Sequence, residues 1–124
     1  MAFIRINNLE FEVVLEDEKS DKMNGEDGVI YLGLTEYCPA PIIYLRKGMK
    51  TGLMRRTVIH ELTHAYIFAY GYSFKSEEDF CKFMESKCCD IIETAEYVYS
   101  LFEKSPWCLE KKSDSVSLMK GELQ

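Results

Sequence analysis

Near the start of the chain, apolar and polar residues alternate with a period of two. The alternation runs through residues 3–6 (FIRI) and again through residues 9–14 (LEFEVV). Asn7 and Asn8 lie between these segments and are well suited to a tight turn. Because a period of two places successive side chains on opposite faces of a strand, this part of the chain is predicted to form a β-hairpin.

Two short apolar runs bounded by turn-forming residues are predicted to be further strands. They are residues 29–34 (VIYLGL) and residues 42–46 (IIYLR). An Asp-Gly pair precedes the first run, and residues 38–41 (CPAP) separate it from the second. Proline removes a backbone donor and restricts the residue before it, so this separator interrupts regular structure.

Two long helices are predicted in the second half of the chain. The first spans about residues 52–70 and ends at Gly71, since glycine readily adopts the left-handed conformation of a helix C-cap. The second spans about residues 77–103, with Ser76 as N-cap and an acidic residue three positions later. Its apolar positions fall on one helical face: Phe80, Met84, Ile91, Ala95, Val98 and Phe102.

Strands followed by helices predict the α+β class, with a small, mostly antiparallel sheet (about residues 1–46) packed beside the two long helices. A chain of 124 residues suits one hydrophobic core. Residues 1–104 are therefore predicted to form a single domain. Residues 105–124 are mostly polar and are predicted to form a C-terminal tail.

Charge and cysteine content narrow the range of partners and compartments. A formal net charge of −6 argues against a nucleic-acid surface, which needs a basic footprint. No run approaches the roughly 18–20 apolar residues of a membrane span, and the first residues lack the apolar run of a signal peptide. The five cysteines are odd in number and two are adjacent, which makes a poor disulfide framework. We therefore expect a cytoplasmic protein that binds neither nucleic acid nor membranes.

The strongest chemical signal is the segment of residues 60–64 (HELTH) in the first predicted helix. His60 and His64 are the 2 histidines of the chain, and they lie about 40° apart around the helix and one turn apart along it. Both imidazoles can therefore reach one tetrahedral Zn²⁺. Glu61 borders such an ion and is placed to act as a general base on a water molecule. The pattern predicts zinc-assisted hydrolysis of an amide bond; the alternative is a core helix whose histidines make ordinary hydrogen bonds.

A catalytic zinc ion usually has three protein ligands, so a third ligand is expected. The metzincin continuation of the motif is excluded, because Ile67 and Tyr70 stand where it requires glycine and histidine. A carboxylate downstream is the remaining choice. Helical phase aims Glu77 toward the first helix and turns Glu78 about 120° away from the apolar face. Glu77 is the preferred ligand, and Glu78 and the more distant Asp90 stay open.

Residues 58–67 (VIHELTHAYI) followed by residues 76–83 (SEEDFCKF) resemble the small HExxH proteins of bacteria and their phages. These are minimal zincins of the gluzincin type, related to the ImmA/IrrE-like metallopeptidases. In that family a glutamate on the helix after the motif completes the site, within a pattern resembling E-x-x-[small]-[Asn/Cys]-x-Phe. Glu77, Cys81 and Phe83 match this pattern, and Phe80 departs from it at the small position. The resemblance covers roughly residues 29–103 and implies that the strand at 42–45 borders the substrate cleft.

The function expected from these features is that of a zinc-dependent metallopeptidase acting on a peptide or protein. His60, His64 and Glu77 would hold Zn²⁺, Glu61 would be the general base, and the peptide would lie along the edge of the strand at residues 42–46. A tyrosine is expected to stabilise the oxyanion. The candidates are Tyr66, Tyr70, Tyr72 and Tyr97. The alternative is a zinc-binding phage or prophage interaction or regulatory domain with little or no proteolytic activity.

Overall fold

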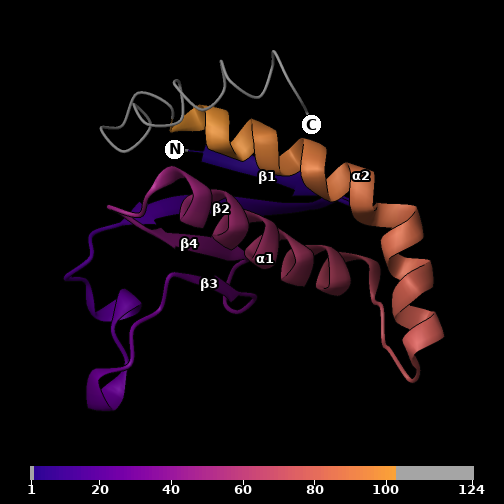
Figure 1. The fold of residues 1–124 in the computed structure, drawn as a ribbon, viewed down its shortest axis with the longest axis horizontal. Coiled ribbons are helices and arrows are strands. Elements are labelled where there is room, and N and C mark those ends of the chain that lie inside the picture. Colours follow the sequence, from indigo (N-terminus) through magenta and orange to yellow (C-terminus); the bar gives the residue numbers. More distant parts are fainter. Residues whose placement is uncertain (1, 103–124) are drawn as a thin grey trace.

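Four strands and two long helices make up residues 2–102, the part of the chain that this computed structural model describes (Figure 1). The predicted α+β class is confirmed. The predicted tail at residues 105–124 lies outside the described residues. The elements are β1 (Ala2–Ile6), β2 (Leu9–Glu16), β3 (Gly33–Glu36), β4 (Ile42–Arg46), α1 (Thr51–Tyr70) and α2 (Glu77–Leu101), with 3₁₀ turns at Asp21–Met23 and Glu26–Gly28.

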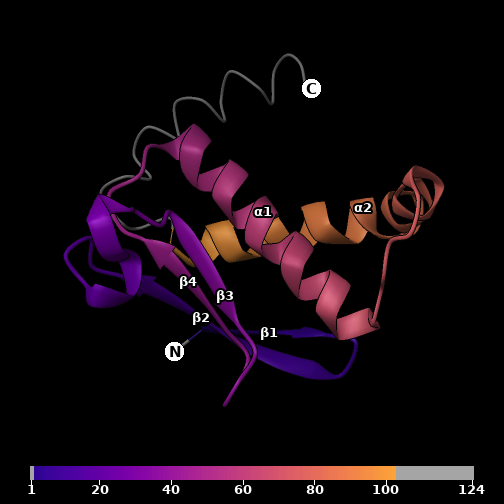
Figure 2. The same ribbon diagram turned by 90° about the horizontal axis from the view of Figure 1, so that it is seen from below.

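The four strands form one mixed sheet in the order β1-β2-β4-β3. The two outer pairs, β1 with β2 and β3 with β4, are antiparallel as predicted, whereas the central pair of β2 and β4 is parallel. Alternate residues of the central strands are buried on one face: Phe11, Val13, Ile43 and Leu45. Both helices cover this face, with α1 next to β3 and β4 and α2 next to β1 (Figure 2).

The strand predicted at residues 29–34 is displaced, because β3 begins only at Gly33. Gly33 is paired with Leu45, and β4 ends at Arg46, so the residues before Leu32 have no partner strand beside them. Residues 29–31 instead pair locally through an isolated bridge between Asn24 and Ile30, and the Leu32 carbonyl accepts one hydrogen bond from the Arg46 N–H of β4. Residues 29–32 consequently lie outside the sheet, with side chains 37–59% exposed.

The helix ends follow the predicted capping residues. Gly71 adopts the left-handed conformation, with φ of 71°, and its N–H donates to the carbonyls of the last turn of α1. At the start of α2, the Ser76 side chain accepts from the Asp79 N–H, and the Asp79 carboxylate accepts from the Lys75 N–H. No helix within residues 2–102 has the length and apolar content needed to cross a bilayer.

The two halves of α2 pack differently. In the second half, Ile91, Ala95 and Val98 are buried in the common core, as the helical periodicity predicts. The ribbon of α2 changes direction part-way along (Figure 1), so the first half does not continue along the same surface. The first half is anchored by Phe83, which packs on an aromatic cluster in the α1–α2 connection. Phe80, predicted to lie on the buried face, is therefore 44% exposed.

The hairpin turn offers a test of how the sheet is tied to α1. Asn7 and Asn8 have φ of 47° and 70°, as a type I′ turn requires, and glycine is compatible with both positions. Asn7 also donates a hydrogen bond from its side-chain amide to the carbonyl of Ala69, at 2.9 Å. We expect Asn7→Gly to have a free energy of unfolding about 0.5–1.5 kcal/mol lower than that of Asn8→Gly, measured by urea denaturation. Equal values would show that this link does not contribute to stability.

Candidate metal and active site

The two histidines of the motif lie on the exposed face of α1. The opposite side of the helix packs into the core through Val58, Leu62 and Ala65, which sets the rotation of the helix about its axis. His60 and His64 are both exposed, their ring centroids are 4.9 Å apart, and the rings are inclined at 77° to one another. The structure thus brings the two imidazoles together, one turn apart, and this donor set suits a zinc ion.

Glu61 lies between α1 and β3 and is only 6% exposed. Its Oε1 atom accepts a hydrogen bond of 2.6 Å from the Thr35 hydroxyl, and the same hydroxyl is 3.4 Å from the Glu61 carbonyl oxygen. A carboxylate bound in this way has a restricted orientation. Thr35 therefore holds the Glu61 carboxylate in one orientation beside the histidines.

The close approach of β3 to α1 depends on a glycine. A Cβ atom at Gly33 would lie 2.7 Å from Glu61 Cγ and 2.9 Å from Thr57 Cγ2, which is closer than such atoms can come. Glycine inside a strand often marks such an approach of another backbone or side chain. Gly33 therefore allows the edge of the sheet to reach the motif helix at the level of Glu61.

The strand that borders the motif is β3, because it ends the strand order of the sheet. The Arg46 N–H donates to the Leu32 carbonyl at 2.9 Å, which sets the alternation of paired residues along β3. By that alternation the backbone groups of Gly33 and Thr35 point away from β4, toward the free edge. The prediction that a peptide binds along residues 42–46 is wrong, since β4 has a strand on each side.

A cavity of about 350 Å³ contains both histidines of the motif. It lies between α1 and the β3 edge, and its walls include the general-base candidate and one tyrosine. The lining residues are Gly33, Leu34, Thr35, Tyr37, His60, Glu61 and His64. The space beside the imidazoles is therefore open to a ligand that also contacts the edge strand.

Tyr37 is the tyrosine of this cavity, and the sequence interpretation missed it. Its hydroxyl donates to the His64 carbonyl at 3.3 Å, and its ring stacks on Phe68 with centroids 4.0 Å apart. Burial raises the pKa of Tyr37, and the nearby Glu61 charge raises it further, so the hydroxyl remains a proton donor at neutral pH. The sequence feature that could have identified Tyr37 is its spacing from Gly33 and Thr35, because residues two apart share one face of an extended segment.

The tyrosines named from the sequence lie elsewhere. The Tyr66 hydroxyl is 2.8 Å from the Thr94 hydroxyl, between α1 and α2, and burial raises its pKa. The ring of Tyr70 lies under the Lys87 ammonium. The remaining two belong to other surroundings, with Tyr72 in the aromatic cluster before α2 and Tyr97 lining a hollow beside β1. None of the four lines the cavity that contains the histidines.

The structure does not bring Glu77 or Glu78 to the histidines. Both are exposed in the first turn of α2, and within residues 2–102 no group of three His, Cys, Asp or Glu side chains lies close enough to hold one ion. Helical phase orients Glu77 toward α1 only if α2 is straight, but the direction of its first turns differs from that of its buried half (Figure 1). Glu77 as third ligand therefore stays a prediction.

Comparison of the chain with models of known families, with curated proteins and with solved structures gave no significant match. The resemblance to ImmA/IrrE-like zincins thus stays a prediction based on the motif residues. The site itself combines two exposed imidazoles, a buried carboxylate and an adjacent edge strand.

The hydrogen bond from Thr35 can be tested by a matched pair of variants. Thr35→Val replaces the hydroxyl by a methyl group and leaves the Glu61 carboxylate without its donor, whereas Thr35→Ser keeps the donor. We expect the free energy of unfolding of Thr35→Val to be about 1–3 kcal/mol below that of Thr35→Ser, measured by urea denaturation with a chelator present. Equal stabilities would mean that solvent satisfies this carboxylate as well as Thr35 does.

Proposed function

We propose that the protein is a zinc-dependent metallopeptidase that hydrolyses peptide bonds with Glu61 as general base. The observation that carries this proposal is the arrangement at the middle of α1. There, His60 and His64 face solvent one turn apart, while Glu61 between them in sequence turns inward to the Thr35 hydroxyl. Two metal-binding imidazoles beside an oriented carboxylate form the set of groups that metal-assisted hydrolysis requires.

The proposed zinc ligands are His60, His64 and Glu77. The Glu77 side chain makes no hydrogen bond or ion pair with the other residues of the 2–102 region and is exposed, so its carboxylate is available for coordination. When bound, Zn²⁺ supplies a water molecule whose pKa is lowered to about 7, together with Lewis-acid polarisation of the substrate carbonyl. The zinc assignment rests on the chemistry of these donors.

Glu61 would transfer the proton in this reaction. Its carboxylate takes a proton from the attacking water as the new C–O bond forms, and it returns that proton to the amine as the C–N bond breaks. The hydrogen bond from Thr35 occupies Oε1 and leaves the other oxygen for this transfer. The net result is the addition of one water molecule across the peptide bond.

The substrate would bind as an extra strand on the edge of β3. The outward backbone groups of Gly33 and Thr35 can form the hydrogen bonds of such a strand, which would carry its backbone past Glu61. Tyr37 is the proposed donor to the developing oxyanion: it lines the same cavity, and its hydroxyl would exchange the hydrogen bond to the His64 carbonyl for one to the oxyanion.

Substitution of the proposed base separates binding from catalysis. Glu61→Gln keeps the shape of the side chain and an oxygen that can accept from Thr35, but it cannot take up a proton. We expect zinc content to stay unchanged and the rate of peptide hydrolysis to fall about 10²–10⁴-fold, the usual contribution of general acid–base catalysis. Hydrolysis at the parental rate would refute the assignment of Glu61.

Metal content tests the ligand set and uses the two neighbouring glutamates as a matched pair. The purified protein is expected to hold one equivalent of zinc, and His60→Ala is expected to abolish binding. We expect Glu77→Ala to weaken zinc affinity by at least about 10–100-fold, because loss of a residue that only hydrogen-bonds to a metal ligand already has an effect of this size. Glu78→Ala is expected to bind zinc with the affinity of the parent. Equal affinities of Glu77→Ala and the parent would refute Glu77 as ligand.

The same preparations distinguish the rival function. A protein that binds zinc through the histidines but cleaves no peptide would support the zinc-binding interaction or regulatory domain. A protein that binds no zinc after gentle purification would contradict both functions.

A further inference from the structure

We propose that a second cavity, beside Glu61, receives a large apolar side chain of the substrate residue next to the cleaved bond. This inference rests on the proposed peptidase function and names the substrate class: peptides with a large aliphatic or aromatic residue at one position flanking the scissile bond. The cavity has a volume of about 420 Å³. This value lies within the range of about 300–1,000 Å³ that is usual for small-ligand sites.

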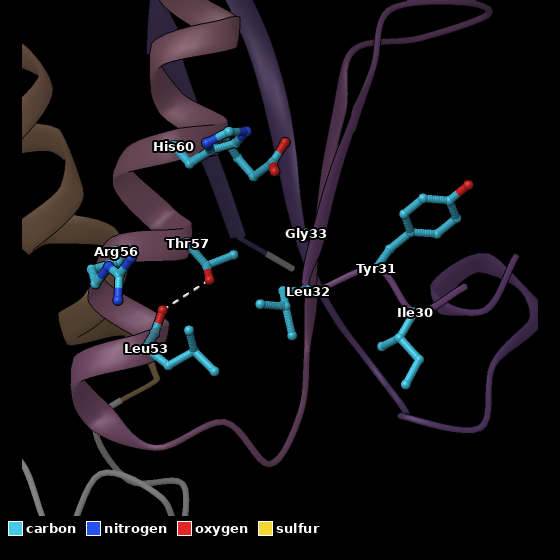
Figure 3. Close-up of a pocket in the computed structure, with 9 residues that line it drawn as sticks. Ile30, Tyr31, Leu32, Gly33, Leu53, Arg56, Thr57 and His60 are labelled. Carbon is cyan, nitrogen blue, oxygen red and sulfur yellow. Dashed lines mark hydrogen bonds between the residues drawn. The ribbon is translucent and has the colours of Figure 1, made fainter. Parts of the chain in front are cut away.

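The cavity lies between the run before β3 and the first half of α1. Figure 3 shows residues 30–33 on one side and the helix on the other, with Leu32 and Leu53 in the space between them. Leu53 comes from the first turn of α1, one turn before Thr57. The walls of the cavity thus combine apolar side chains with the motif residues His60 and Glu61.

The apolar wall is exposed although its residues are typical of a buried strand. Residues 29–32 are four apolar or aromatic side chains in succession, and the exposed fraction of Ile30 reaches 59%. Leu53, which lies toward Leu32 in Figure 3, is 38% exposed. Single exposed apolar residues are common on proteins, but a contiguous exposed group beside a polar site marks a binding surface.

This cavity shares lining residues with the cavity that contains the histidines, and the shared residues indicate which part of a peptide could enter it. Gly33, His60 and Glu61 line both this cavity and the one that contains the histidines. A peptide strand on the β3 edge that passes Glu61 therefore has a residue beside this cavity. Because side chains of a strand alternate between faces, one flanking residue points into the cavity and its neighbour points away.

Charge favours an apolar occupant over an acidic one. Arg56 also lines the cavity, and an acidic side chain could approach it. Arg56 is exposed, however, and an exposed ion pair contributes little in water. Burial of a whole leucine or phenylalanine side chain against Leu32 and Leu53 is the larger gain.

The test uses a peptide library in which each position flanking the cleaved bond is varied in turn. For the zinc-loaded parent, we expect kcat/KM for leucine or phenylalanine at one flanking position to exceed that for alanine about 10–200-fold. Leu53→Ser should reduce this ratio, and Leu53→Phe should shift the preference toward smaller residues because it fills the cavity. The control is Ile92→Ser, on an exposed apolar residue of α2, which should keep the parental preference.

Failure of the inference can be told apart from failure of the proposed function. Cleavage without preference for a large apolar residue, a preference for acidic residues, or an unchanged ratio in both Leu53 variants would overturn the apolar cavity alone. If the parent cleaves nothing, the affinity of the same peptides for Glu61→Gln is measured by fluorescence anisotropy. A preference for large apolar residues that Leu53→Ser removes would then support the cavity without the peptidase, and uniform affinities would overturn the cavity as well.

Discussion

The contact between β3 and α1 at Gly33 is the constraint on which the site depends. Without a side chain at this position, Glu61 lies against the edge of the sheet, where any Cβ would come within 2.7 Å of its Cγ atom. The same approach brings the Thr35 hydroxyl to the Glu61 carboxylate and places Tyr37 beside His64. The absence of a side chain at Gly33 therefore allows the Glu61 carboxylate, the edge of β3 and the Tyr37 hydroxyl to lie close together.

The rotation of α1 about its axis supplies the other half of this geometry. Leu62 and Val58 are buried in the core, which leaves the two histidines facing solvent and turns Glu61 toward the sheet. Successive residues of a helix differ by about 100°, so three neighbours in sequence can face the core, the sheet edge and water. Tertiary packing of the apolar face thus orients the polar groups, and a change in that packing would move all of them.

The helices, their caps and the N-terminal hairpin could be predicted from residues that are close together in the sequence. Gly71, Ser76 and the Asn7-Asn8 turn each act through their own backbone conformation, and each is found where the sequence predicts it. Features that depend on distant pairing were not predictable in this way. The parallel pairing of β2 with β4, the roles of Thr35 and Tyr37, and the direction of the first turns of α2 all depend on contacts between segments far apart in the chain.

Residues 29–32 were predicted to belong to a strand but lie before β3, and this difference bears on the proposed function. Their composition favours a strand, but β4 ends at Arg46, so residues 29–31 lie outside the sheet and the apolar side chains of this run stay exposed beside the motif. The next residues, in β3, do have a partner, but only on one side, so their outward backbone groups are also unpaired. An extended peptide with one large apolar side chain would satisfy both, since its backbone would pair with β3 and its side chain would cover the exposed wall. The segments that local sequence rules describe least well are thus the ones with exposed apolar side chains and an unpaired strand edge, which the proposed peptide would cover.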